Sequence, residues 1–572
     1  MTATLATAVI APESSEELAD QAAPLDALLV RATQSPLRRF VPTMSTAKFA
    51  AGLVRRPGPS GRRLIDLGRE IARVAAGTSG ITPARRDRRF TDDAWSDNPV
   101  LRRVLQAYLA AGQAAEDLVT DADLDWRDAE RVRFMVENVS QALAPSNVPL
   151  LNPASAKAAI DTAGLSLLRG GRNLLGDMTS APHVPAMVDT SGFEVGRNIA
   201  ATPGAVVLRT EMLELIQYTP STDQVRQVPL LIVPPTINKH YALDLAPDRS
   251  LVEYLVGQGQ QVFMIAWRNP DARHADWGMD AYVTAVIQAL DAVERIAGTS
   301  NTAVAGVCSG GIIASLAAAH LAATGRQDRL AAFTLLVTVL DNAQAGTSAA
   351  LVDAPTAAAA KAMSRRRGYL DGRALAEVFA WLRPGDLIWN YWVNNYLLGK
   401  QPPAFDILFW NADTTRMTAG LHADFIDIAM GNGLVTPGAV SALGTPVDLS
   451  EIRADAYVVA GIADHITPWQ NCYRSTQLLG GDTRFVLSTS GHIAALVNPP
   501  GNPKATFQTS TDTVSDPQQW LASAGTEQGS WWPDFAAWLG ERCGPTTAAP
   551  QQLGGGGLRP LTAAPGTYVF EK

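Results

Sequence analysis

Cysteine is scarce in this sequence. Only three cysteines occur among 572 residues, at positions 308, 472 and 543. Three thiols cannot form a disulfide framework, which excludes the class of secreted proteins that disulfides stabilise. Because one of the three stands in the pattern of a nucleophile, we expect the protein to work in a reducing compartment.

Signals for secretion and membrane insertion are lacking as well. The first residues have no basic region and carry Glu13, Glu16, Glu17 and Asp20, so we predict no secretory signal. The one long uncharged stretch, residues 296–325, is interrupted by glycines and polar residues. This pattern indicates a buried strand, a turn and a helix rather than a transmembrane span.

Motifs for phosphate and metal binding are absent too. The chain contains neither G-x-x-x-x-G-K-[ST] nor H-E-x-x-H, and no cluster of metal ligands has a recognisable spacing. The formal net charge is −8, which argues against a nucleic-acid partner. We therefore expect no metal, no cofactor and no nucleic acid.

What the sequence does have is a stretch around Cys308 that organises the chain. A short apolar strand, residues 302–305, is followed by Gly306-Val307-Cys308-Ser309-Gly310-Gly311 and a helix that continues to about residue 323. G-x-C-x-G is the nucleophile-elbow pattern with cysteine in place of serine, and its glycines permit a sharp strand-to-helix turn. The helix N-terminus favours an anion, which suits a thiolate. The alternative is a structural cysteine in a glycine-rich turn.

The rest of the chain reads as a helical part followed by an α/β part. Residues 1–36 are predicted to be a disordered lead, and residues 37–200 have helical periodicity. From 201 to 572, apolar runs alternate with amphipathic helices, which is typical of a parallel sheet. An aromatic-rich insertion at about 341–449 interrupts this alternation as a cap, and residues 546–558 resemble a mobile tail. The fold class predicted is α/β: an α/β-hydrolase fold with an inserted cap, preceded by a helical N-terminal domain.

A cysteine nucleophile in this fold needs an acid and a histidine later in the chain, each just after a strand. Asp464 follows the predicted strand 456–460, and His492 follows 484–487 through a Ser-Gly turn, so both order and placement fit. His465 is interpreted as a supporting residue of the same loop, with a purely structural histidine as the alternative. Cys472 and Cys543 lack an elbow and are interpreted as structural.

Two backbone N–H groups are needed to stabilise the oxyanion of a thioester reaction. One is expected from Ser309, the residue after the nucleophile. The other is expected from the loop after the strand that ends at residue 233. Pro234 and Pro235 have no N–H group, which leaves Thr236 or Ile237.

These motifs resemble one known family, the polyhydroxyalkanoate synthases. The resemblance runs from about residue 88 to 568 and is carried by the elbow together with several longer strings. They are Val233-Pro234-Pro235-Thr236-Ile237-Asn238-Lys239, Trp267-Arg268-Asn269-Pro270, Asp386-Leu387-Ile388-Trp389-Asn390-Tyr391-Trp392, Phe405-Asp406-Ile407-Leu408-Phe409-Trp410-Asn411, Asp464-His465-Ile466-Thr467-Pro468-Trp469 and Ser490-Gly491-His492-Ile493. The single-subunit, medium-chain-length type (class II) is the most similar, with class I as the alternative.

The resemblance implies an acyltransferase that polymerises (R)-3-hydroxyacyl-CoA and releases CoA. Cys308 would carry the growing chain and His492 would deprotonate it. Asp464 would orient His492 and help activate the 3-hydroxyl of the incoming unit. The family also implies a homodimer on cytoplasmic polyester granules, with the N-terminal domain serving granule association, granule-associated partners or dimerisation.

Two other functions remain open from the residues alone. A cysteine esterase or thioesterase would use the same three residues, Cys308, Asp464 and His492. A non-catalytic coat protein of polyester granules would need none of them. The chemistry favours transfer, because exchange between two thioesters is nearly balanced and a thiolate is a strong nucleophile.

Overall fold

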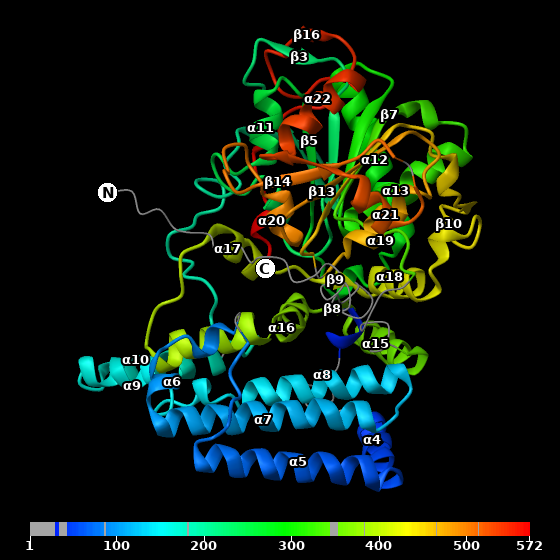
Figure 1. The fold of residues 1–572 in the computed structure, drawn as a ribbon. Helices are drawn as coiled ribbons and strands as arrows, with labels where there is room; N and C mark the ends of the chain where they lie inside the picture. The colour runs from blue at the N-terminus through cyan, green and yellow to red at the C-terminus, as the bar shows by residue number, and fades with distance from the viewer. Residues whose placement is uncertain are drawn as a thin grey trace.

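The computed structural model describes residues 29–33, 43–84, 87–179, 182–343, 353–382, 384–464, 466–512 and 514–572. Helices form the first part of the chain: α4 (Thr43–Arg55), α5 (Pro57–Ala76), α6 (Ala94–Asp97), α7 (Pro99–Asp121), α8 (Trp126–Ala142), α9 (Pro153–Asp161) and α10 (Leu165–Met178). The Asn98 side chain begins α7 by accepting the N–H groups of Val100 and Leu101, and Asp125 begins α8 in the same way. Helices α5, α7 and α8 pack side by side as a layer at one end of the molecule (Figure 1).

An eleven-stranded sheet forms the centre of the remaining chain. Its strands, in spatial order, are β15 (Gly525–Gln528), β14 (Thr506–Thr509), β13 (Thr483–Ser488), β12 (Ala456–Gly461), β7 (Leu330–Leu336), β6 (Thr302–Val307), β4 (Leu230–Val233), β5 (Val262–Trp267), β2 (Leu213–Tyr218), β1 (Gly204–Arg209) and β17 (Thr562–Ala563). The strands from β13 to β5 are parallel, and the outer strands pair antiparallel. The carboxyl ends of the parallel strands therefore meet at one edge.

Helices cover both faces of this sheet. On one face lie α12 (Met279–Ala297), α13 (Ser309–Ala323) and α19 (Trp469–Thr476), and on the other α11 (Leu251–Gly257), α20 (His492–Leu496) and α22 (Trp532–Arg542). Every residue of β4, β5, β6 and β12 is buried, as expected for strands packed on both sides. The predicted α/β class is confirmed by this arrangement.

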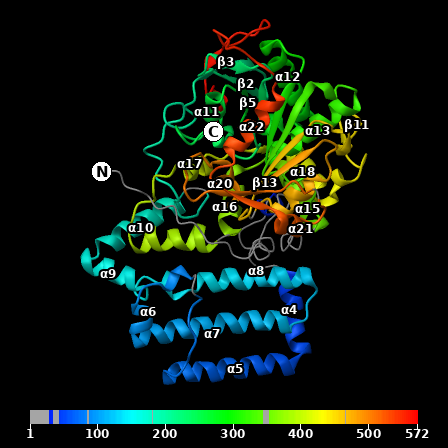
Figure 2. The same cartoon turned by 45° about the horizontal axis from the view of Figure 1, so that its top comes forward.

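The chain between β7 and β12 is the segment that we interpret as the inserted cap. It contains α15 (Ala354–Arg367), α16 (Gly372–Leu382), two π-helical turns (Gly385–Trp389 and Trp392–Leu397), α17 (Asp406–Ala412) and α18 (Ala419–Gly431). In Figures 1 and 2, α15 and α16 lie between the helical layer and the sheet. The helical part contacts this insertion in two places. Arg131 of α8 forms an ion pair with Asp353, and the Trp392 indole donates a hydrogen bond to the carbonyl of Asn147, in the turn after α8, at 3.1 Å.

The start of the chain differs from the expected disordered lead. Leu29 and Val30 are fully buried in the main core, and the carbonyl of Leu29 lies 3.2 Å from Nε2 of His422. Their apolar side chains explain this placement, since burial removes them from water. The rest of 1–36 lies outside the described residues, apart from 31–33.

Residues 546–558, which we expected to form a mobile tail, are instead packed against the sheet. Strand β16 (Thr546–Ala548) pairs with β3 (Gln224–Arg226), and the N–H of Gly554 donates to Oε1 of Gln217 at 2.6 Å. All four glycines of 554–557 have a positive φ, and a Cβ on Gly555 would lie 2.9 Å from the Ile296 carbonyl oxygen. The glycine run therefore meets a conformational requirement of a packed turn.

Candidate active site

Cys308 lies in the turn between β6 and α13. Its backbone angles, φ 49° and ψ −121°, belong to a region that non-glycine residues rarely adopt. A Cβ on Gly306 would approach Cα of Gly311 to 2.5 Å, and one on Gly310 would overlap the carbonyl oxygen of Pro234. The elbow glycines are therefore needed for the close approach of α13 to its neighbours, which holds Cys308 at the sheet edge.

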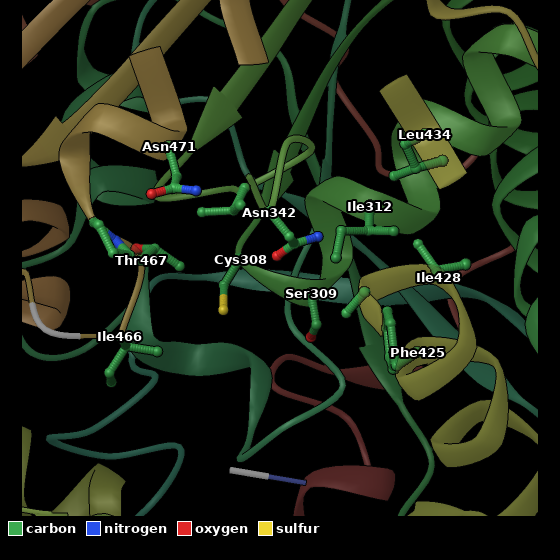
Figure 3. A pocket seen from close by; sticks show the side chains of 13 residues that line it. Cys308, Ser309, Ile312, Asn342, Phe425, Ile428, Leu434, Ile466, Thr467 and Asn471 are labelled. Carbon is green, nitrogen blue, oxygen red and sulfur yellow. The ribbon is translucent and has the colours of Figure 1, made fainter. Parts of the chain in front are cut away.

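The Cys308 sulfur points into a cavity of about 30 Å³ (Figure 3). Its walls come from the elbow, the loop after β7, helix α18 with the turn that follows it, and α19 with the loop before it. They are Ser309, Ile312, Val339, Asn342, Phe425, Ile428, Ala429, Leu434, Ile466, Thr467, Pro468 and Asn471. Most of these side chains are apolar. A space of this size holds roughly two water molecules, and its apolar walls suit the alkyl part of an acyl group.

His492 and Asp464 form the predicted pair at the same sheet edge. Asp464 follows β12, His492 begins α20 after β13, and Nδ1 of His492 lies 2.7 Å from Oδ2 of Asp464. Both residues are buried, with 8% and 2% of their surfaces exposed. The structure thus brings together the acid and the base that were assigned from chain order.

The Asp464 carboxylate is fully occupied by hydrogen bonds. Oδ1 accepts the N–H groups of Ile466 (2.8 Å) and Thr467 (2.9 Å), and Oδ2 accepts the Thr467 hydroxyl (2.6 Å) in addition to its contact with His492. Burial raises the pKa of Asp464, but His492 and the bonds from Thr467 outweigh it, so the pKa lies below its ordinary value. Asp464 is therefore held as an anion.

Burial by itself lowers the pKa of His492, but charge interactions and hydrogen bonds with Asp464 and Cys308 outweigh it. The pKa of His492 is raised from 6.5 to about 10. The two groups that raise the pKa of His492, Asp464 and Cys308, both belong to the candidate site. The imidazolium form of His492 is therefore stabilised beside the Cys308 sulfur.

The two residues left open for the second oxyanion donor differ in their contacts. The N–H of Thr236 donates to the Ser309 hydroxyl at 3.0 Å and so is already used. Among the described residues, no hydrogen bond is formed by the N–H of Ile237. We infer that Ile237 and the N–H of Ser309, the first residue of α13, are the oxyanion donors.

Side chains of the cap hold the loop that carries Ile237. The Thr415 hydroxyl donates to the carbonyls of Thr236 (3.2 Å) and Asn238 (3.4 Å). The Trp410 indole donates to the Lys239 carbonyl at 2.7 Å. The insertion therefore fixes the backbone on both sides of the inferred donor.

The remaining predicted residues are placed as follows. His465 lies outside the described residues, so its supporting role stays a prediction. Cys472 and Cys543 are fully buried, and burial raises the pKa of both thiols, which suits inert structural cysteines. Sequence reasoning missed the role of Thr467, although it stands in the Asp-His-Ile-Thr string and an Asp followed three residues later by Thr can form such a turn. In the described part of the chain, no group of three His, Cys, Asp or Glu residues could hold a metal ion.

A cysteine on a strand-to-helix elbow, with an Asp–His pair after two later strands, is the arrangement of the α/β-hydrolase fold. Residues 229–499 match the family model described as alpha/beta hydrolase fold, and residues 86–255 match Poly-beta-hydroxybutyrate polymerase (PhaC) N-terminus.

Whole-chain similarity is more specific. Poly(3-hydroxyalkanoate) polymerase 1 of Ectopseudomonas oleovorans is 47% identical over 519 residues, which cover 91% of this chain and 92% of that protein. The Poly(3-hydroxyalkanoate) polymerase subunit PhaC of Cupriavidus necator is 41% identical over 506 residues, 87% of this chain and 85% of that protein. The chain belongs to the poly(3-hydroxyalkanoate) polymerase family, and the resemblance found in the sequence is confirmed.

Proposed function

We propose that this protein polymerises (R)-3-hydroxyacyl-CoA into polyester and releases CoA, with a thioester on Cys308 as the covalent intermediate. The observation that carries the proposal is the geometry of the site. The chain that holds it is 47% identical, over 91% of its length, to a poly(3-hydroxyalkanoate) polymerase. In this chain Cys308, His492 and Asp464 meet at one sheet edge.

The first step transfers the acyl group to the enzyme. The Cys308 thiolate attacks the carbonyl carbon of the CoA thioester, and the N–H groups of Ser309 and Ile237 stabilise the oxyanion. The bond between that carbon and the CoA sulfur breaks, and the leaving CoA thiolate takes a proton from protonated His492. A raised pKa suits His492 to this acid role.

The second step forms the ester. The 3-hydroxyl of an incoming hydroxyacyl-CoA attacks the Cys308 thioester, gives its proton to His492 and displaces the Cys308 thiolate. Once Cys308 is acylated it no longer raises the pKa of His492, because a thioester carries no negative charge, so the imidazole can act as a base. The lengthened chain, now on CoA, then acylates Cys308 again.

Asp464 acts in both steps through His492. Its four hydrogen bonds leave no free acceptor directed at a substrate, and only 2% of the residue is exposed. The direct activation of the 3-hydroxyl by Asp464, which the family resemblance implied, is replaced in our proposal by orientation and charge stabilisation of His492.

The preferred acyl group is proposed to be of medium chain length. The cavity walls beside Cys308 include Phe425, Ile428 and Leu434, which suit an alkyl chain. We further propose that the protein works as a homodimer on cytoplasmic polyester granules. Exposed apolar residues on α9 and α10, such as Ile160, Leu168 and Leu175, make the helical part the candidate for that contact. No helix in the described residues is long and apolar enough to cross a membrane.

One assay tests the activity against its rivals. The protein is incubated with 3-hydroxybutyryl-CoA and 3-hydroxyoctanoyl-CoA, thiol release is followed, and the acyl product is identified by mass spectrometry. Polymer supports the proposal, free hydroxy acid would indicate a cysteine esterase or thioesterase, and no thiol release would indicate a coat protein. The granule contact is tested by mixing the protein with increasing amounts of polyester particles and measuring the fraction that sediments with them. An α10 variant such as Leu168→Lys is measured for comparison and should sediment less.

A further inference from the structure

The cavity beside Cys308 contains few polar side chains, and most of them are already engaged. The Ser309 hydroxyl accepts the N–H of Thr236 at 3.0 Å. The Thr467 hydroxyl donates to Asp464 at 2.6 Å. These groups serve the site itself, so they are poorly suited to recognising a substituent on the acyl chain.

Asn342 is different. Its side chain lines the cavity, and in Figure 3 its carboxamide lies between Cys308 and Ile312 in the view. Among the described residues, no hydrogen bond is formed by this carboxamide. Asn342 is only partly buried, and a carboxamide both donates and accepts hydrogen bonds. Asn342 therefore offers a free polar group to whatever occupies the cavity.

The backbone that carries Asn342 is fixed from two sides. Its own N–H donates to Oδ1 of Asn432, the residue after α18, at 2.8 Å. Nδ2 of Asn471, on α19, donates to the carbonyls of Asp341 (2.7 Å) and Ala343 (3.0 Å). The two carbonyls flank Asn342 directly. The carboxamide thus projects from a pre-positioned backbone, as a recognition group should.

The substrate class under "Proposed function" supplies one matching group. Apart from the thioester carbonyl, the only polar group in the acyl part of a short 3-hydroxyacyl-CoA is its 3-hydroxyl, which also donates and accepts. We propose that the Asn342 carboxamide hydrogen-bonds the 3-hydroxyl of the acyl group bound beside Cys308 and makes the site selective for 3-hydroxyacyl over unsubstituted acyl thioesters. This inference rests on the proposed function for its substrate class.

The test compares Asn342→Leu with the unaltered protein on two substrates that differ only in the hydroxyl. Single-turnover CoA release is measured with 3-hydroxybutyryl-CoA and with butyryl-CoA, which can acylate Cys308 but cannot be extended. One neutral hydrogen bond corresponds to about tenfold in rate. Asn342→Leu should lose about tenfold on the hydroxylated substrate and stay within about twofold on butyryl-CoA. Equal losses on both substrates, or no loss on either, would overturn the assignment.

A binding measurement separates this inference from the proposed function. Calorimetry with two unreactive thioethers, S-(3-hydroxybutyl)-CoA and S-butyl-CoA, needs no turnover. The unaltered protein should bind the hydroxylated analogue about tenfold more tightly, and Asn342→Leu should bind both equally; no preference in the unaltered protein refutes the inference whether or not polymer forms. If Asn342→Leu does not fold, Asn342→Ser, which is smaller and polar, is measured in the same way and must show a reduced preference.

Discussion

The exchange of Asp464 for asparagine tests the division of labour between acylation and elongation. Oδ1 of Asp464 accepts two backbone N–H groups, so the oxygen of an asparagine must keep that position. The amide nitrogen then takes the place of Oδ2 and donates to Nδ1 of His492, 2.7 Å away in the native pair. The proton of neutral His492 is forced onto Nε2, and a nitrogen that already carries a proton cannot accept one from Cys308 or a hydroxyl.

The two steps should suffer unequally. In a serine enzyme the same exchange costs about 10⁴-fold, or about 5 kcal/mol of barrier. Elongation activates an alcohol and should approach that loss. Acylation uses a thiol, which is intrinsically a much stronger nucleophile than an alcohol and depends less on a base, so its loss should be smaller by at least about tenfold.

The measurement pairs rapid-quench acylation in a single turnover with steady-state polymer formation for Asp464→Asn. Thr467→Val is the matched control. It removes one hydrogen bond from the carboxylate but leaves the tautomer of His492 unchanged, so roughly a tenfold to hundredfold loss should fall equally on both steps. Equal losses in acylation and elongation for Asp464→Asn would refute the tautomer reasoning.

Four further outcomes are expected. Cys308→Ala should abolish CoA release without changing the melting temperature by more than a few degrees, while Cys472→Ala should keep most activity; turnover by Cys308→Ala would show that another residue is the nucleophile. Thr415→Val should lower kcat about tenfold with KM little changed, because it loosens the loop of the inferred oxyanion donor, and Thr415→Ser should restore the rate. Four additional buried methylenes contribute roughly 3 kcal/mol, so kcat/KM should be up to about a hundredfold higher for 3-hydroxyoctanoyl-CoA than for 3-hydroxybutyryl-CoA, and Phe425→Ala should widen that ratio; a preference for the four-carbon substrate would contradict the chain-length proposal alone. The raised pKa of His492 contributes stability that is complete below pH 6.5 and lost as the pH rises towards about 10, so the urea unfolding free energy should fall more steeply across this window in the unaltered protein than in His492→Ala; parallel slopes would show that this proton does not differ between the folded and unfolded states.

The elbow and the Asp–His pair could be predicted because their signals are local. Glycines on both sides of Cys308 are required by a turn of a few residues, and Asp464 and His492 each follow an apolar strand in the order the fold demands. The observed fold and the family resemblance agree with the features predicted from these local patterns. Such features could be predicted because each depends on only a few neighbouring residues.

The features that could not be predicted depend on contacts between distant segments. The choice between Thr236 and Ile237 turns on a hydrogen bond between Thr236 and Ser309, 73 positions apart. Gly554 belongs to a run that looks like low complexity, yet its conformation is set by packing against the sheet. Asn342 is one asparagine among many until the fold places it on the cavity wall.

The same site could in principle transfer an acyl group to water or to an alcohol, and the structure suggests why an alcohol wins. The side chains beside Cys308 are mostly apolar and offer water few hydrogen-bond partners, so few waters are held at an acylated sulfur in a productive orientation. A hydroxyl held beside the thioester has an effective concentration of roughly 10⁵ M or more, far above that of liquid water. Polymerisation over hydrolysis then depends on how firmly the hydroxyl is positioned. On this reasoning, a variant that loosens the positioning of the hydroxyl without affecting Cys308 should raise the ratio of free hydroxy acid to polymer.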